Sequence, residues 1–113
     1  MPKLIEILAT LESFAPLRLA AEWDNVGLLL GERDRDVSRV MTCLTLTPDS
    51  AAEAVARGAD LVVSHHPLLF RGTKRLTSDT TEGRVVLELL RGGVTVYSPH
   101  TAFDNCTGGI NEQ

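Results

Sequence analysis

The sequence has no surplus of basic residues and no long apolar run. Its 113 residues carry a formal net charge of −4, so there is no excess of positive charge to neutralise the phosphates of a nucleic acid or an anionic membrane surface. No apolar stretch approaches the roughly 20 residues that a transmembrane helix needs. We therefore expect neither a nucleic-acid partner nor a membrane partner.

Cysteine is scarce as well. The two cysteines, Cys43 and Cys106, form no C-x-x-C pair and are too few for the disulfide framework of a small secreted domain. This usage is typical of a reducing compartment, so we expect a cytoplasmic protein. Hydrophobic residues make up 43% of the chain, which excludes a disordered protein and provides the core of a single domain over residues 1–113.

The spacing of apolar residues predicts an α/β fold. From residue 39 onward the expected order is strand, helix, strand, helix, strand, and right-handed crossovers then produce a mainly parallel sheet with helices on its faces. The strand predicted at residues 40–46 is expected to be largely buried. The strands are predicted at residues 26–30, 40–46, 61–64 and 94–98.

Capping signals mark the ends of the predicted helices. Thr47 is the expected N-cap of a helix over residues 48–57. Asp79 and Glu82 resemble a capping box for a helix that runs through residue 90. Further helices are expected at residues 1–14 and from residue 108.

All three histidines of the chain directly follow two of the predicted strands. His65 and His66 come after the strand at 61–64, and His100 comes after the next strand, with Asp104 close behind. Because the carboxyl ends of parallel strands meet at one edge of a sheet, we expect these side chains to converge. Imidazole and carboxylate ligands suit Zn, Fe, Mn or Ni, and one carboxylate can bridge two ions. The pattern predicts a metal site for one ion or two; a solvated loop or a pair of helix-cap donors is the alternative.

Other reactive side chains have two interpretations each. Arg71, Lys74 and Arg75 follow the histidine pair and could hold the phosphate of an anionic substrate, or lie in a solvated loop. Cys106 could bind a soft ion or be an unreactive loop thiol, and Cys43 is expected in the core.

Four ordered segments carry a family resemblance. They read WDNVGL at 23–28, GADLVVSHHPLLF at 58–70, HTAFD at 100–104 and GGIN at 108–111. In this order and with these separations they resemble the Nif-three-like family, whose members are also known as GTP cyclohydrolase 1 type 2 homologues or dinuclear-metal-centre proteins. The match extends over almost the whole chain.

The resemblance implies a cytosolic α/β protein that holds two divalent ions in a cleft and often assembles as a toroidal homohexamer. The family's ligands carry over to His65, His66, His100 and Asp104. Asp24 is placed near the cleft, as a wall residue or in an Asx turn. The family's cyclohydrolase label implies metal-dependent hydrolysis of a small, nucleotide-like substrate such as GTP; a non-catalytic metal-binding, regulatory or interaction module is the alternative.

The chain departs from the family pattern in two respects. Many members have an aspartate in a Leu-Asp-Val-Thr strand pattern where this chain has Thr45, whose hydroxyl can still donate and accept a hydrogen bond. Family proteins are also much longer, and a distal histidine and glutamate complete their ligand set. The resemblance therefore implies an N-terminal lobe, truncated on its C-terminal side, with weakened metal affinity and little hydrolase activity.

Overall fold

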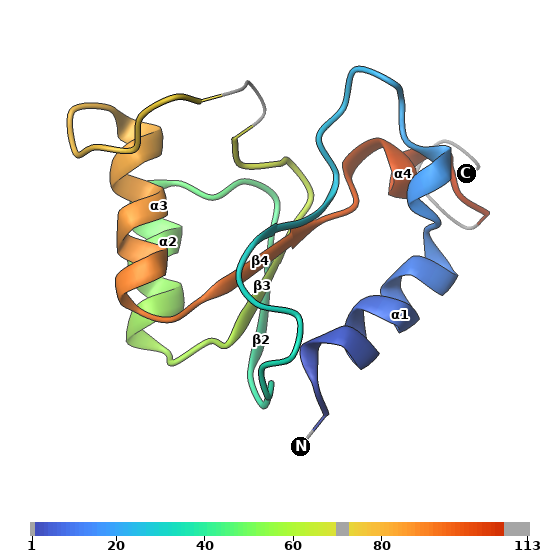
Figure 1. Ribbon diagram of the computed structural model, residues 1–113, viewed down its shortest axis with the longest axis horizontal. Helices are drawn as coiled ribbons and strands as arrows, with labels where there is room; N and C mark the ends of the chain where they lie inside the picture. Colours follow the sequence, from blue (N-terminus) through green and yellow to red (C-terminus); the bar gives the residue numbers. More distant parts are fainter. Residues whose placement is uncertain (1, 70–72, 108–113) are drawn as a thin grey trace.

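A four-stranded sheet lies between two layers of helices in the computed structural model, which describes residues 2–69 and 73–107 (Figure 1). The elements are α1 (Leu4–Phe14), the 3-10 helix η1 (Leu17–Leu19), β1 (Gly27–Leu30), β2 (Val40–Cys43), α2 (Pro48–Ala56), β3 (Leu61–Ser64), α3 (Thr81–Arg91), β4 (Thr95–Ser98) and α4 (His100–Asn105). The strand order is β1-β4-β3-β2; β2, β3 and β4 are parallel, and β1 pairs antiparallel with β4. The predicted α/β class with a mainly parallel sheet is confirmed.

The start and end of α2 follow the predicted capping pattern. The hydroxyl of Thr47 accepts a hydrogen bond from the backbone N–H of Ser50, whose own hydroxyl accepts from the N–H of Thr47. Pro48 occupies the first helical position, where its missing N–H has no partner to lose. After the helix, Gly58 has φ +68°, a left-handed conformation that glycine adopts without steric cost.

The predicted capping box of α3 is wrong by one residue. The N-cap is Thr80, whose side chain accepts from the N–H of Gly83, and the helix begins at Thr81. The carboxylate of Glu82 accepts from the backbone N–H of Leu69, 3.2 Å away, rather than capping its own helix. The local pattern assigned the carboxylate of Glu82 to the N-terminus of α3, but the backbone N–H of Leu69, far away in the sequence, binds it instead.

Two other predicted elements are shorter in the structure by more than one residue. The strand expected over 40–46 ends at Cys43, and it is not largely buried: β2 is an edge strand whose Val40 is 51% exposed. The prediction failed because a run of apolar residues does not reveal whether a strand has one neighbour or two. The first helix begins only at Leu4, with Lys3 as its N-cap. The helix expected from residue 108 lies outside the described residues.

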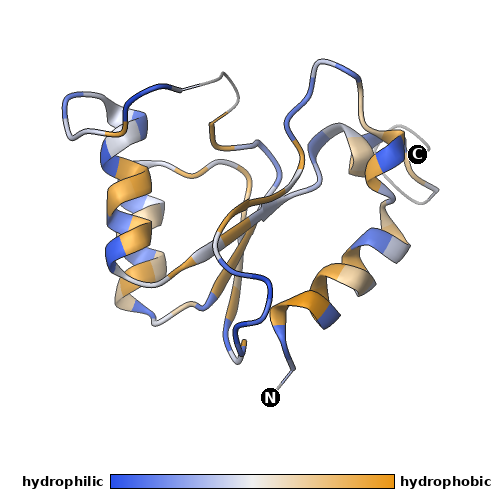
Figure 2. Ribbon diagram, in the orientation of Figure 1, coloured by the Kyte–Doolittle hydropathy of each residue, from blue (hydrophilic) through white to orange (hydrophobic). Residues whose placement is uncertain are grey.

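Alternation along the strands divides the apolar side chains between the two faces of the sheet. On one face, α2 and α3 enclose Val62 and Val96; on the other, α1 covers Leu61 and Tyr97. Apolar residues are concentrated in the strands and in these three helices (Figure 2). Within the described residues, no helix combines the length and apolarity needed to cross a bilayer.

Asp60 holds the segment that leads into β2. Its carboxylate accepts hydrogen bonds from the backbone N–H groups of Ser38 (2.8 Å) and Arg39 (3.1 Å), and the guanidinium of Arg35 lies 3.0 Å away. These contacts, led by the N–H of Ser38, hold the pKa of Asp60 below its ordinary value despite partial burial. The ionised carboxylate therefore stabilises the folded state.

Replacing Asp60 by alanine is expected to lower the free energy of unfolding by about 1–3 kcal/mol at neutral pH, because hydrogen bonds to charged groups contribute about that much. In the parent, this stabilisation is complete above the unfolded-state pKa of about 4 and is lost as the pH falls through the lower folded-state pKa. Urea unfolding of both proteins from neutral to acidic pH should show the difference shrinking in acid.

The matched control is Asp36→Ala, which removes an exposed ion pair with Lys3. It should cost less than about 1 kcal/mol across the same pH range. An Asp60→Ala variant as stable as the parent at neutral pH would contradict the assignment.

Candidate metal centre

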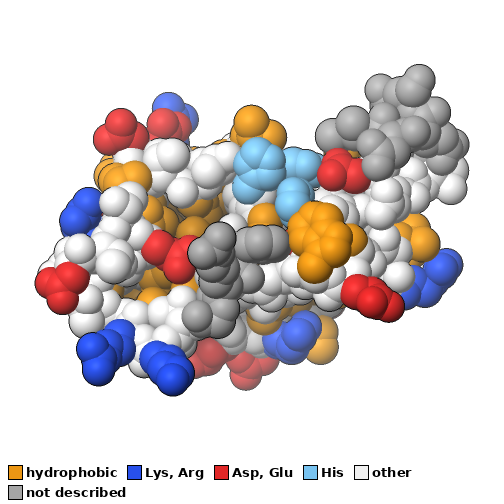
Figure 3. Space-filling model, turned by 90° about the horizontal axis from the view of Figure 1, so that it is seen from above, with side chains coloured by type: hydrophobic (Ala, Val, Ile, Leu, Met, Phe, Trp, Pro, Cys, Tyr) orange, Lys and Arg blue, Asp and Glu red, His pale blue; other side chains and the backbone are white. Residues whose placement is uncertain are grey.

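The three histidines meet at the carboxyl ends of β3 and β4. These strands are adjacent and parallel, so the histidine pair that follows β3 lies beside His100, the first residue of α4. Each of His65, His66 and His100 offers a ring nitrogen within 4.8 Å of those of the other two. The histidine side chains form one patch at the surface of the molecule (Figure 3). The structure thus brings together the residues that strand-end placement predicted to converge.

Asp104 lies at the margin of this cluster. It projects from α4, which the sequence patterns did not predict, and its Oδ1 is 3.3 Å from Nε2 of His65. This oxygen is buried and has no hydrogen-bond partner. A buried carboxylate oxygen left without a partner is costly, and a bound cation would satisfy it. The donor set therefore fits a divalent ion, with three imidazoles at its centre and a carboxylate beside His65.

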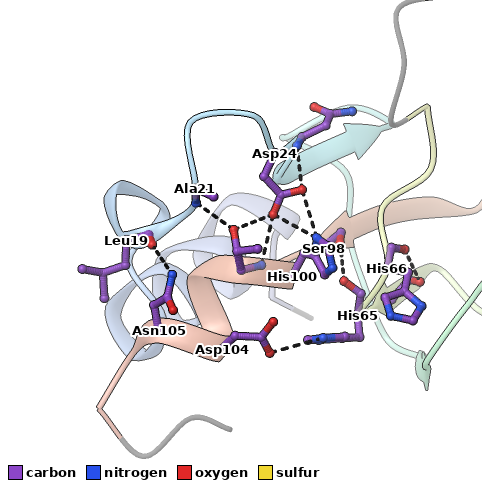
Figure 4. Close-up of polar contacts among 12 residues, drawn as sticks. Leu19, Ala21, Asp24, His65, His66, Ser98, His100, Asp104 and Asn105 are labelled. Carbon is purple, nitrogen blue, oxygen red and sulfur yellow. Dashed lines mark hydrogen bonds and ion pairs between the residues drawn. The ribbon is translucent and has the colours of Figure 1, made fainter. Parts of the chain in front are cut away.

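Asp24 reaches His100 from the loop between η1 and β1 (Figure 4). Both of its carboxylate oxygens lie 2.9 Å from Nδ1 of His100, and the hydroxyl and backbone N–H of Thr101 also donate to it. Burial by itself raises the pKa of Asp24, but the hydrogen bonds from His100 and Thr101 outweigh it and leave the pKa below its ordinary value. Asp24 therefore lies beside the histidine cluster, near where the resemblance placed it, and its buried carboxylate pairs with Nδ1 of His100, a contact that the sequence did not reveal.

Three hydroxyl groups orient the histidine pair. The hydroxyl of Thr45 lies 2.7 Å from Nδ1 of His66, in agreement with the expectation that it can hydrogen-bond near the site. Ser98 donates to the carbonyl oxygen of His65, and Ser64 donates to that of His66. Both serines are fully buried. Their positions at the ends of β4 and β3 are the sequence signal from which these roles could have been predicted.

The surroundings of His65 favour its neutral form. Burial lowers its pKa, and the neighbouring rings of His100 and His66 lower it further, while the carboxylate of Asp104 opposes them. Neutral imidazole is the form that binds a metal ion. The site therefore requires little change in protonation at His65 before it can accept a divalent ion.

The remaining candidates are two thiols, two exposed basic side chains and one residue outside the described part of the chain. Cys106 is buried after α4 and donates its Sγ–H to the carbonyl oxygen of Phe103, so it is a packed thiol. Cys43 is half-buried against the core, as expected, and burial raises its thiol pKa. Lys74 and Arg75 are exposed, and Arg71 is outside the described part of the chain.

Relatives of the chain match it along nearly its whole length. It is 38% identical over 110 residues to a Clostridium perfringens protein named GTP cyclohydrolase 1 type 2 homolog, a match that covers 97% of this chain and 42% of that protein. NIF3-like protein 1 of Drosophila melanogaster is 38% identical over 111 residues, covering 97% of this chain and 38% of its own. The chain thus spans about two-fifths of the length of these curated relatives.

Solved structures share the fold. A Bacillus cereus protein related to NIF3 superposes with a TM-score of 0.92 at 32% identity, covering 98% of this chain and 30% of its own. Reduced HcgD from Methanocaldococcus jannaschii superposes with a TM-score of 0.91 at 31% identity, covering 98% of this chain and 44% of its own. Residues 2–113 match the family described as Duf34/NIF3 (NGG1p interacting factor 3). The chain, with its histidine cluster at the ends of two parallel strands, belongs to the DUF34/NIF3 family.

Proposed function

We propose that this chain binds divalent transition-metal ions through His65, His66, His100 and Asp104, and that this site serves metal-dependent hydrolysis of a small, nucleotide-like substrate. The observation that carries the proposal is the donor set itself. Three imidazole nitrogens lie within 4.8 Å of one another, and a buried carboxylate oxygen beside them lacks a hydrogen-bond partner. Zn, Fe, Mn and Ni all accept such ligands, and a complete site would hold two ions.

The protein groups have distinct tasks in this proposal. A bound divalent ion would lower the pKa of a water molecule and polarise an electrophilic centre. Asp24 and Thr45 orient the rings of His100 and His66 through their Nδ1 atoms. The buried serine hydroxyls hold the backbone of the histidine pair in place. The substrate class rests on the names of relatives such as the C. perfringens protein, of which this chain covers less than half.

A non-catalytic metal-binding module is the second candidate, and one observation favours it. The four donors come from the two segments that follow β3 and β4, so an ion held by all of them would tie these segments together and stabilise the fold. The two functions differ in coordination. A catalytic ion keeps a position for water or substrate, whereas a structural ion is enclosed by protein ligands.

The test is elemental analysis of the purified chain after incubation with Zn, Mn, Fe(II) or Ni in turn and removal of unbound ion. We expect at least one of these metals to be retained and GTP hydrolysis or ring opening to stay low. A version extended to the full length of the relatives should be the more active, because the added part would wall the site and complete its ligands.

The outcomes separate the two functions. No retention of any of the four metals would contradict metal binding. Retained metal without turnover by the extended version would favour the non-catalytic module. Equal turnover by both versions would show that residues 1–113 contain the whole catalytic machinery.

A further inference from the structure

We propose that Asp24 is a positioning residue of the histidine cluster: its carboxylate holds His100 in the Nδ1–H tautomer, so that Nε2 is the nitrogen left for a metal ion. The inference deepens the proposed function and rests on it for the identity of the ligand. It concerns a residue outside the predicted ligand set, 76 positions before His100 in the sequence.

The geometry leaves one tautomer for the ring. Both oxygens of Asp24 lie 2.9 Å from Nδ1 of His100, and the side chain of Asp24 is wholly buried. The backbone N–H groups of Asn25 and Thr101 and the hydroxyl of Thr101 all donate to this carboxylate, so it acts as an acceptor toward the ring as well, and Nδ1 carries the proton. The lone pair of a neutral His100 then resides on Nε2. A carboxylate on the opposite ring nitrogen also raises the basicity of a metal-binding histidine.

The carboxylate is itself fixed by further donors. Asp24 accepts from the hydroxyl of Thr101 at 2.6 Å, from its backbone N–H at 3.1 Å and from the N–H of Asn25 at 2.9 Å. The hydroxyl of Thr101 accepts in turn from the N–H of Ala21, so the loop before β1 and the start of α4 are joined at this point (Figure 4).

The backbone at His100 is strained where Asp24 contacts it. His100 has φ +25°, outside the conformations that non-glycine residues favour, and Pro99 supplies no side-chain cap to α4. Asp24 contacts the side chain of His100 and the backbone N–H of Thr101, on both sides of this strained position. Asp24 thus sets the direction of the ring as well as its tautomer.

His66 provides a comparison within the same cluster. Its Nδ1 faces the hydroxyl of Thr45, which can donate or accept, so this contact orients the ring without selecting a tautomer. The carboxylate of Asp24 accepts from Nδ1 of His100 and therefore selects the Nδ1–H tautomer of that ring. The tautomer of His100 should therefore be uniform, whereas that of His66 is not determined by Thr45.

The test uses long-range proton–nitrogen NMR of the metal-free chain, labelled with nitrogen-15 in histidine. His100 should show the Nδ1–H pattern in the unaltered chain, and Asp24→Asn should populate the other tautomer. Metal affinity, measured by competition with a chelator, should fall about 10–100-fold in Asp24→Asn. The control Asp36→Asn, at the exposed pair with Lys3, should change neither measurement.

An Nε2–H pattern for His100 in the unaltered chain would overturn the proposal, and this measurement does not depend on whether the variant folds. A folded Asp24→Asn variant with the parent's tautomer and affinity would overturn it as well. If the unaltered chain shows the Nδ1–H pattern but retains no metal, the positioning by Asp24 is supported and the proposed function is the part that fails.

Discussion

Replacing His65 and His66 together by alanine is expected to abolish metal binding while the fold survives. The double variant removes two of the three imidazole nitrogens that lie within 4.8 Å of one another. It leaves His100 and Asp104, too few ligands for a tetrahedral site. The hydrogen bonds from Ser98 and Ser64 go to backbone carbonyl oxygens and persist without the imidazole rings.

Metal stoichiometry from elemental analysis, together with circular dichroism, measures this outcome. The matched control is the double variant Lys74→Ala, Arg75→Ala, which removes two exposed charges from the segment that follows the histidines. It should retain the parent's metal content. Unchanged stoichiometry in the histidine variant would show that the ion binds elsewhere.

Replacing Leu89 by alanine is expected to destabilise the fold by about 2–5 kcal/mol. Leu89 is fully buried on α3, in the apolar cluster that also contains Ala54, Val62 and Val96. The variant loses the transfer free energy of the removed atoms and leaves a cavity between α2, α3 and the sheet. Since small domains are stable by only about 5–15 kcal/mol, this is a large fraction of the total.

Urea unfolding of the parent and the variant measures the loss. The neighbouring Leu90 is 49% exposed and offers a control with the same chemical change. Leu90→Ala should shift the free energy of unfolding by no more than about 1 kcal/mol. Equal effects at both positions would mean that α3 does not pack on the sheet through Leu89.

Helices and strands were predictable where the residues that determine their ends lie within a few positions of one another. Thr47 caps α2 through Ser50, three residues further along, and Gly58 follows the end of that helix. The capping pattern at Asp79 was misleading because the carboxylate of Glu82 accepts a hydrogen bond from the backbone N–H of Leu69. Short-range patterns therefore located the elements, and tertiary contacts moved some of their ends.

The candidate site could be predicted only in part. The convergence of His65, His66 and His100 follows from a general property of parallel sheets, since adjacent strand ends lie at one edge. The position of the Asp104 carboxylate beside His65 depends on α4, a short helix whose N-cap, Pro99, makes no side-chain cap hydrogen bond. The resemblance placed Asp24 near the cleft, but no sequence pattern paired its carboxylate with His100.

By itself, the sequence determined the α/β class, the parallel order of the last three strands and the two segments that carry the metal-ligand candidates. These follow from side-chain periodicity, capping residues and crossover handedness, which act over a few residues or apply to every sheet of this kind. Only the tertiary structure decided that β2 is an edge strand, that β1 pairs antiparallel with β4 and that the carboxylate of Asp24 is buried against His100. Each of these depends on which distant segments pack together, because burial and hydrogen-bond partners far along the chain are properties of the whole fold.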